Sequence, residues 1–227
     1  MDEEGQVVVS GKKRKRSRKQ KARGKKAQRR KSYPFHEESP LPGVPGRYWA
    51  QRYRYFSRFA EGVQMDEESW YSVTPEAIAA HIARRCACDI VVDAFAGCGG
   101  NAIQFALNSH LVVAIDIDPG KIAMLRHNAA VYGVRDRIEC VVGDAMRILP
   151  LIPPGLADVV FLSPPWGGPG YAAASGGGGG YDPATMLAPP LAGDVLFRAA
   201  RAVTPNVVCF LPRNVNPCKV AGLLVAA

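Results

Sequence analysis

The sequence predicts a doubly wound α/β fold, in which helices cover both faces of a parallel sheet. Five short runs rich in Val, Ile and Leu predict strands, at residues 90–94, 111–115, 138–142, 159–162 and 207–211. Helical patterns follow at 101–108, 119–132 and 193–202. Because parallel strands need long crossover connections, strands that alternate with helices favour a parallel sheet. Ligands of such sheets bind beyond the carboxyl ends of the strands.

The basic charge of the 227-residue chain is confined to its beginning. Residues 1–31 hold fourteen Lys and Arg against three acids, a net charge of +11, whereas the remaining 196 residues hold 15 bases and 17 acids, a net charge of −2. Such a run of like charges repels itself and is predicted to be disordered. It suits a nuclear or nucleolar import signal, or a non-specific RNA tether that releases counterions from phosphates. A solvated tail without a partner is the third interpretation.

Composition divides the chain into four segments. A basic tail (1–31) is followed by a linker rich in proline and glycine (32–46), a helical extension (47–75) and the α/β domain (76–227). In the extension, Trp49, Tyr53 and Phe56 follow helical spacing and predict one helix with an apolar face. Thr74 is the predicted N-cap of the next helix, with Pro75 at its first position.

Several classes of protein do not fit the composition. No apolar run approaches the roughly 18 residues that a membrane span needs, and the acidic start does not resemble a secretory signal. Six scattered cysteines lack paired C-x-x-C motifs, so they indicate reduced, intracellular thiols rather than disulfides or structural zinc. The four histidines are equally dispersed. We therefore expect neither a metal site nor a membrane partner.

Acidic residues follow three successive predicted strands. Asp93 precedes a turn that contains Gly97 and Gly99, Asp116 lies 23 residues later at the end of the second strand, and Asp144 follows the third. These positions suit an ammonium, a ribose diol and an adenine amino group, which S-adenosylmethionine combines. The glycine spacing also fits a dinucleotide fingerprint. A nicotinamide cofactor is disfavoured because the Asp93 carboxylate would repel a pyrophosphate.

The fourth predicted strand ends in Ser163-Pro164-Pro165-Trp166. A polar residue, two prolines and an aromatic residue at this place are typical of methyltransferases that act on amino nitrogens. The prolines stiffen the turn and leave carbonyl acceptors free, Ser163 supplies another acceptor, and the Trp166 ring can stack on a base. Together they would orient the lone pair of the amino group towards the methyl carbon. The alternative is an ordinary turn before a packed tryptophan.

Seven motifs together resemble the trimethylguanosine synthase family of RNA cap hypermethylases. The resemblance covers about residues 47–220 and is carried by Arg47-Tyr-Trp-Ala-Gln-Arg-Tyr, Trp70-Tyr-Ser-Val-Thr-Pro-Glu76, Val92-Asp-Ala-Phe, Gly99-Gly-Asn101-x-Ile-Gln-Phe-Ala, Ile115-Asp-Ile-Asp-Pro119, Ser163-Pro-Pro-Trp-Gly-Gly-Pro169 and Phe210-Leu-Pro-Arg-Asn214. It implies a class I methyltransferase fold and two methyl transfers from S-adenosylmethionine to N2 of the 7-methylguanosine cap. The implied substrates are small nuclear and nucleolar RNAs, with ribonucleoprotein proteins as further partners. The implied location is the nucleus, in the nucleolus or Cajal body, with the cytoplasm as a second location.

The resemblance also implies a set of site residues. Those for the cofactor are Phe56, Ser72, Thr74, Asp93, Phe95, Gly97, Asn101, Asp116, Ile117 and Asp144. Ser163, Pro164 and Trp166 would be catalytic, with Trp166 stacked on the 7-methylguanine. Arg47, Arg213 and Asn214 would meet the cap phosphates, and Asn128 and Tyr171 would seat the nucleotide. Family members usually have Lys where this chain has Arg47. The extension would form a lid over both ligands.

Two departures from the family pattern keep alternatives open. Five glycines, 176–180, interrupt the loop after Tyr171, and ordering such a loop costs entropy. A class I methyltransferase sheet has seven strands, whereas this sequence predicts five and ends at Ala227 without the final antiparallel hairpin. A truncated or alternatively spliced product with little activity is therefore one hypothesis. The others are an adenine-N6 or protein-glutamine methyltransferase, and an inactive cap- or RNA-binding isoform.

Overall fold

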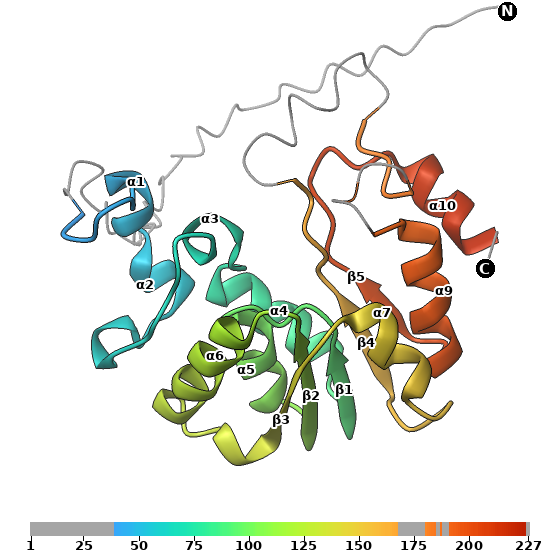
Figure 1. The fold of residues 1–227 in the computed structure, drawn as a ribbon, viewed down its shortest axis with the longest axis horizontal. Helices are drawn as coiled ribbons and strands as arrows, with labels where there is room; N and C mark the ends of the chain where they lie inside the picture. The colour runs from blue at the N-terminus through green and yellow to red at the C-terminus, as the bar shows by residue number, and fades with distance from the viewer. Residues whose placement is uncertain (1–38, 168–179, 185–186, 188–190, 226–227) are drawn as a thin grey trace, which may run out of the picture. The chain divides into compact units, whose positions relative to one another are not determined.

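The computed structural model describes residues 39–167, 180–184, 187 and 191–225, and its centre is a parallel sheet (Figure 1). Each neighbouring pair of strands is parallel, in the order β3-β2-β1-β4-β5. The strands are β1 (Ile90–Asp93), β2 (Leu111–Asp116), β3 (Ile138–Val142), β4 (Val159–Leu162) and β5 (Val207–Cys209). The predicted α/β fold is thus confirmed, and every predicted strand is present.

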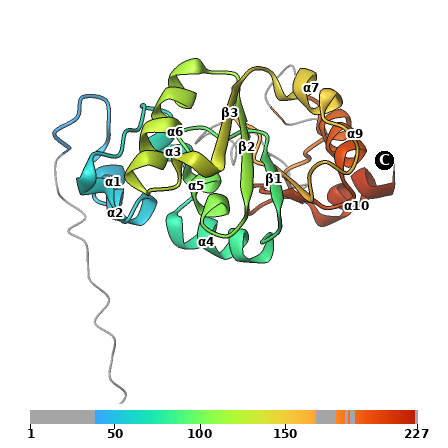
Figure 2. The same cartoon turned by 90° about the horizontal axis from the view of Figure 1, so that it is seen from below.

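Helices cover both faces of the sheet (Figures 1 and 2). On one side lie α4 (Glu76–Arg85), α5 (Gly100–Ala106) and α6 (Pro119–Val131), and on the other lie α7 (Ala145–Ile148), α9 (Gly193–Val203) and α10 (Pro217–Val225). Alternate strand residues serve the two sides, because Val91 packs with Phe105 and Leu125, whereas Val92 packs with Leu149 and Leu196. Two apolar cores therefore hold the carboxyl ends of the strands in place.

The extension before the sheet consists of short helical pieces. They are α1 (Gly46–Trp49), α2 (Arg52–Tyr55), the 3₁₀ turn η1 (Phe59–Glu61) and α3 (Ser69–Ser72). The predicted single helix through Trp49, Tyr53 and Phe56 was therefore wrong, since Phe56 is extended, with φ −139° and ψ 115°. Trp49 packs against Phe59 at 5.7 Å between ring centroids, while Phe56 packs against Tyr132 at 6.2 Å. The rings serve different neighbours, and tertiary packing overrides the helical spacing.

Thr74 does not cap α4, contrary to the prediction. The helix begins at Glu76, and the preceding Pro75 makes no side-chain capping bond. The Thr74 hydroxyl instead accepts a hydrogen bond from the Asn101 Nδ2 amide at 3.1 Å. A partner 27 residues away has taken the oxygen that a local cap would have used.

Within the described residues the sheet ends at β5, which pairs only with β4. None of the described strand pairs is antiparallel, and α10 follows instead. Two further 3₁₀ turns, η2 (Arg135–Arg137) and η3 (Leu149–Leu151), complete the described elements. No helix in this part of the chain could span a membrane, and it contains no cluster of three His, Cys, Asp or Glu suited to a metal. Residues 1–38 lie outside it, so the predicted segment boundaries stay predictions.

Candidate active site

The turn between β1 and α5 is held open by a carboxylate from the next strand. Asp116 accepts the Gly97 N–H at 2.8 Å through one oxygen and the Asp118 N–H at 3.0 Å through the other. Gly97 adopts φ +54°, and a Cβ built there would meet no heavy atom within 4 Å. Each Asp116 oxygen keeps a second lone pair. The turn therefore leaves space for a ligand, with acceptors at its rim.

Two buried acceptors near this turn have no donor among the described residues. They are Oδ2 of Asp93, at the end of β1, and Oδ1 of Asn101, in the first turn of α5. Burial raises the pKa of Asp93 to about 7; the Phe95 N–H opposes this shift, and the nearby Asp116 charge adds to it. Because buried polar atoms in folded proteins almost always have a partner, this pair indicates a cationic or donor ligand.

Two further predicted cofactor residues lie beyond the ends of β2 and β3. Ile117 directly follows Asp116, and its side chain is 70% exposed, an apolar surface on which a planar ring can rest. Asp144 precedes α7 and accepts the Met146 N–H at 2.9 Å, which fixes the direction of its carboxylate. The three strand-end acids therefore share one edge of the sheet, as the sequence predicted.

The Ser163-Pro164-Pro165-Trp166 segment lies beside the β1 turn. Asp93 pairs with Phe161 in the sheet register, and two residues later the Ser163 hydroxyl donates to the Phe95 carbonyl at 3.3 Å. Trp166 donates from Nε1 to the Phe210 carbonyl at 3.1 Å, and its ring lies 5.4 Å from that of Phe210. Pro164 is buried. The two motifs that the sequence singled out thus meet at neighbouring strand ends.

The extension packs directly against the glycine-rich turn. A Cβ on Gly100 would lie 2.6 Å from the Val73 Cγ2 methyl, so only glycine allows this approach. Asn128 in α6 accepts the Gln64 N–H at 2.8 Å and donates to the carbonyls of Gln64 and Cys98 at 2.8 and 2.9 Å. Asn128 is fully buried, and its observed role is to join the extension to the turn. Its predicted contact with a nucleotide stays a prediction.

The remaining predicted residues lie around this centre. Phe56 is buried against Tyr132, and the exposed Ser72 donates its hydroxyl to the Glu68 carbonyl at 2.9 Å. Arg47 and Arg213 are exposed, and the Asn214 carbonyl accepts the Tyr181 N–H at 2.8 Å. Tyr171 lies outside the described residues.

Sequence reasoning did not single out Lys121, in the first turn of α6. Its amine lies 2.6 Å from Glu68 and 3.8 Å from Asp66, both in the extension. Burial alone would lower the pKa of Lys121, but the Glu68 hydrogen bond and the neighbouring acids raise it. This charged group holds the extension beside the Asp116 loop. No pattern in the sequence indicates a pairing across 53 residues.

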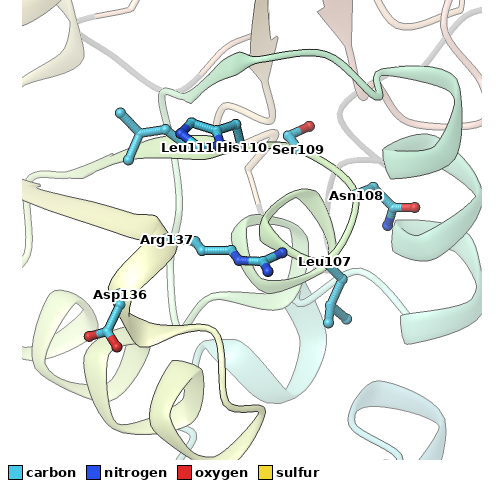
Figure 3. Close-up of a pocket in the computed structure, with 7 residues that line it drawn as sticks. All are labelled: Leu107, Asn108, Ser109, His110, Leu111, Asp136 and Arg137. Atoms are coloured by element: carbon cyan, nitrogen blue, oxygen red, sulfur yellow. The ribbon is translucent and has the colours of Figure 1, made fainter.

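A separate hollow of about 600 Å³ lies at the other end of the sheet (Figure 3). Leu111 begins β2 in this hollow, whereas Asp116 ends the same strand at the candidate site. Its lining consists of Leu107, Asn108, Ser109, His110, Leu111, Asp136 and Arg137. It contains none of the predicted site residues.

Comparison with known proteins places this geometry in a family. The profile of the RNA cap guanine-N2 methyltransferases matches residues 88–225. The chain belongs to this family. It is 42% identical over 190 residues to trimethylguanosine synthase from Schizosaccharomyces pombe, covering 81% of this chain and 77% of the relative. Trimethylguanosine synthase from Saccharomyces cerevisiae is 35% identical over 192 residues, which cover 81% of this chain and 59% of the relative.

A solved structure also aligns with this member of the cap methyltransferase family, at lower identity. The precorrin 8W decarboxylase structure from Methanobacterium thermoautotrophicum aligns with a TM-score of 0.45 and 18% identity, over 67% of this chain and 70% of that one. Family membership confirms the resemblance that the sequence motifs gave. The roles of the individual site residues stay predictions.

Proposed function

We propose that this chain transfers methyl groups from S-adenosylmethionine to N2 of a 7-methylguanosine RNA cap, giving 2,2,7-trimethylguanosine. The hydrogen bond from Ser163 to the Phe95 carbonyl carries the proposal, because it places the cofactor turn beside the segment suited to an amino group. When bound, the cofactor supplies a methyl group on a positively charged sulfur. The protein supplies placement of donor and acceptor in line.

The residues at the carboxyl ends of β1, β2 and β3 fit this cofactor. The unpaired oxygens of Asp93 and Asn101 are acceptors for its ammonium, and ion pairing would return Asp93 to its charged form. Asp116 keeps lone pairs for the ribose hydroxyls. Ile117 offers an apolar surface to the adenine, and Asp144 an acceptor for the adenine amino group.

The acceptor side fits a methylated guanine. Ser163 and the Pro164 carbonyl would accept hydrogen bonds from the N2 amino group and so orient its lone pair. The Trp166 ring would stack on the base, and the positive charge of 7-methylguanine strengthens that contact. Arg47 and Arg213 are exposed guanidinium groups, suited to the cap phosphates.

Transfer of labelled methyl groups to two capped RNAs tests the proposal. The RNAs differ only in the 7-methyl group of the cap, and we expect transfer to the 7-methylated RNA alone. Equal transfer to both, or transfer to neither, would contradict the proposal. Adenine-rich RNA and glutamine peptides test the two other methyltransferase hypotheses. Calorimetry tests the inactive isoform, which would bind the cap without binding S-adenosylmethionine.

We further propose that the substrates are small nuclear and nucleolar RNAs, met in the nucleus together with ribonucleoprotein proteins. The charge of +11 on residues 1–31 supports this proposal, since clustered Lys and Arg suit nuclear import and attraction to RNA. A fluorescent fusion of the chain should concentrate in nuclei, and deletion of residues 1–31 should disperse it. Equal distribution of both fusions would contradict the assigned location.

A further inference from the structure

A row of cationic, polar and aromatic side chains runs along α1 and α2, and its two arginines are exposed. Gln51 contacts both arginines of this row, because its Nε2 donates to the Arg47 backbone carbonyl at 2.8 Å and its Oε1 accepts Arg54 Nη1 at 3.3 Å. Both arginine side chains are exposed. Gln51 thus lies between the Arg47 backbone and the Arg54 guanidinium.

Two tyrosines continue this row towards the candidate active site. The Arg47 guanidinium lies 4.9 Å from the Tyr48 ring centroid, and the Tyr48 and Tyr71 rings are 6.4 Å apart. Tyr71 is 43% exposed and stands two residues before Val73, which packs against Gly100. Arg47, Tyr48, Gln51, Arg54 and Tyr71 therefore form a continuous strip, here called the arginine–tyrosine strip, that leads away from the glycine-rich turn.

The charges along the strip are unequal at its two ends. Within the described residues neither Arg47 nor Arg54 has an ion pair, whereas Arg58 pairs with Glu61 and Arg198 with Asp194. At the other end, burial raises the pKa of Tyr71, and the nearby Glu68 and Glu67 add to the shift. Phosphate attraction therefore belongs to the arginine end, and ring contact to the tyrosine end.

We propose that the arginine–tyrosine strip binds the nucleotides of the RNA chain that follow the cap dinucleotide. Guanidinium groups that no acid neutralises attract the phosphates. The exposed Tyr71 ring, with the half-buried Tyr48 ring beside it, can stack on bases of a single strand without reading their sequence. The proposal rests on the proposed cap methyltransferase function, which brings a capped RNA to this edge of the sheet. It assigns Arg54 and Tyr71 to the RNA chain beyond the cap.

Two substrates of the full chain separate this proposal from cap recognition. One is the 7-methylguanosine cap dinucleotide, and the other is a short oligonucleotide with the same cap. We expect Arg54→Gln to raise KM for the capped oligonucleotide about fivefold, and to lower the slope of log affinity against log salt by about one. KM for the dinucleotide should not change. Tyr71→Ala should raise the oligonucleotide KM as well, and Tyr71→Phe should restore it.

Arg84→Gln is the matched control. Arg84 is also exposed, forms no ion pair with a described acid, and lies at the end of α4 near the start of β1. The substitution removes the same charge away from the strip, so both KM values should stay unchanged. Equal effects of Arg54→Gln on the two substrates, or equal effects of Arg54→Gln and Arg84→Gln, would overturn the proposal.

Failure of the proposed function would give a different result. In that case the unmodified chain methylates neither substrate, and fluorescence polarisation with the labelled capped oligonucleotide still compares Arg54→Gln with Arg84→Gln. Weaker binding by Arg54→Gln alone would support the strip, and equal binding by both variants would overturn it.

Discussion

Asp93 is buried at the end of β1 with one carboxylate oxygen that no donor in the described part of the chain reaches. Burial raises the pKa of this group to about 7, against about 3.9 in an unfolded chain. Between these two values the folded state binds more protons than the unfolded state, so this group makes the free energy of unfolding fall as pH rises. The ligand-free protein therefore carries a destabilising charge above pH 7, in the place where a cationic ligand is proposed.

Asp93→Asn tests both the destabilisation caused by the buried charge and the proposed binding of a cationic ligand by Asp93. We expect the substitution to raise the thermal midpoint of the free protein at pH 8, because it removes a buried carboxylate that is charged at this pH. At pH 4 Asp93 is already neutral, so the midpoint should not rise. The rise in midpoint on adding S-adenosylhomocysteine should disappear, because a ligand stabilises only the state that it binds. Asp89→Asn, an exposed acid before β1, should alter neither quantity. A lower midpoint at pH 8 with a retained ligand effect would contradict the assignment.

Trp166 gives a second prediction for a single residue. Trp166→Ala should abolish cap binding in calorimetry while largely sparing S-adenosylmethionine binding, since the ring packs on Phe210, in the segment that follows β5. Trp166→Phe keeps an aromatic ring and should retain part of the cap affinity. Loss of both ligands in Trp166→Ala would show misfolding instead of a lost stacking surface.

Asp116 shows which features of a single site residue can be predicted from the sequence. Its place at the end of β2 was predictable from the run of β-branched residues before it. Its hydrogen bond to the Gly97 N–H was not, because the sequence does not specify how two loops from neighbouring strands meet. The same limit explains Asn128, which was predicted to contact a nucleotide and is observed to tie Gln64 to Cys98.

At the scale of elements, Glu76 joins three pieces of the chain. Its carboxylate accepts the Ser57 N–H at 2.5 Å, the Ser57 hydroxyl at 2.8 Å and the Tyr132 hydroxyl at 2.6 Å. Burial, followed by the bond to Glu76, raises the pKa of Tyr132 to about 12, so its phenol remains a donor. These bonds connect the extension, the start of α4 and the residue after α6.

Breaking this connection should loosen the extension. We expect Glu76→Gln and Tyr132→Phe each to lower the free energy of unfolding by about 1–2 kcal/mol, since each leaves a hydrogen-bonding group without its partner. The double variant should lose less than the sum, because both act on one network. Urea denaturation measures all three. Glu61→Gln, which breaks only the exposed pair with Arg58, should leave the free energy of unfolding nearly unchanged.

The strands were predictable and the extension was not, for one physical reason. Ile90-Val-Val-Asp93 and Leu111-Val-Val-Ala-Ile-Asp116 are apolar because both faces of a parallel sheet are buried, so their local pattern suffices. The conformations of Phe56 and Thr74 depend instead on distant partners. Phe56 packs against Tyr132, 76 residues later, and Thr74 accepts a hydrogen bond from Asn101, 27 residues later. The start of α10 does have a local sequence signal, an asparagine followed by proline. The Asn216 side chain accepts the Cys218 N–H at 2.9 Å, and Pro217 is the first residue of the helix.

At the scale of the whole molecule, the proposed attraction to RNA and the proposed recognition of the cap belong to different parts of the chain. Residues 1–31 carry +11, whereas the other 196 residues carry −2. A nearly neutral domain has little general affinity for phosphates, so on the proposed function its selectivity for the cap would come from a few placed side chains such as Trp166 and Arg213. The proposed tether in residues 1–31 would act on any RNA, because counterion release does not depend on sequence or on the cap.

Deletion of residues 1–31 should therefore weaken RNA binding without changing methyl transfer to the cap dinucleotide. Binding of capped and uncapped RNA should weaken together, and the slope of log affinity against log salt should become shallower by about 0.9 for each phosphate that the tail neutralises. KM and kcat for the cap dinucleotide should stay unchanged, because the dinucleotide offers the tail few phosphates. Fluorescence polarisation over a salt series and methyl transfer to the dinucleotide measure the two properties. Loss of dinucleotide turnover would instead place part of the active site in the tail.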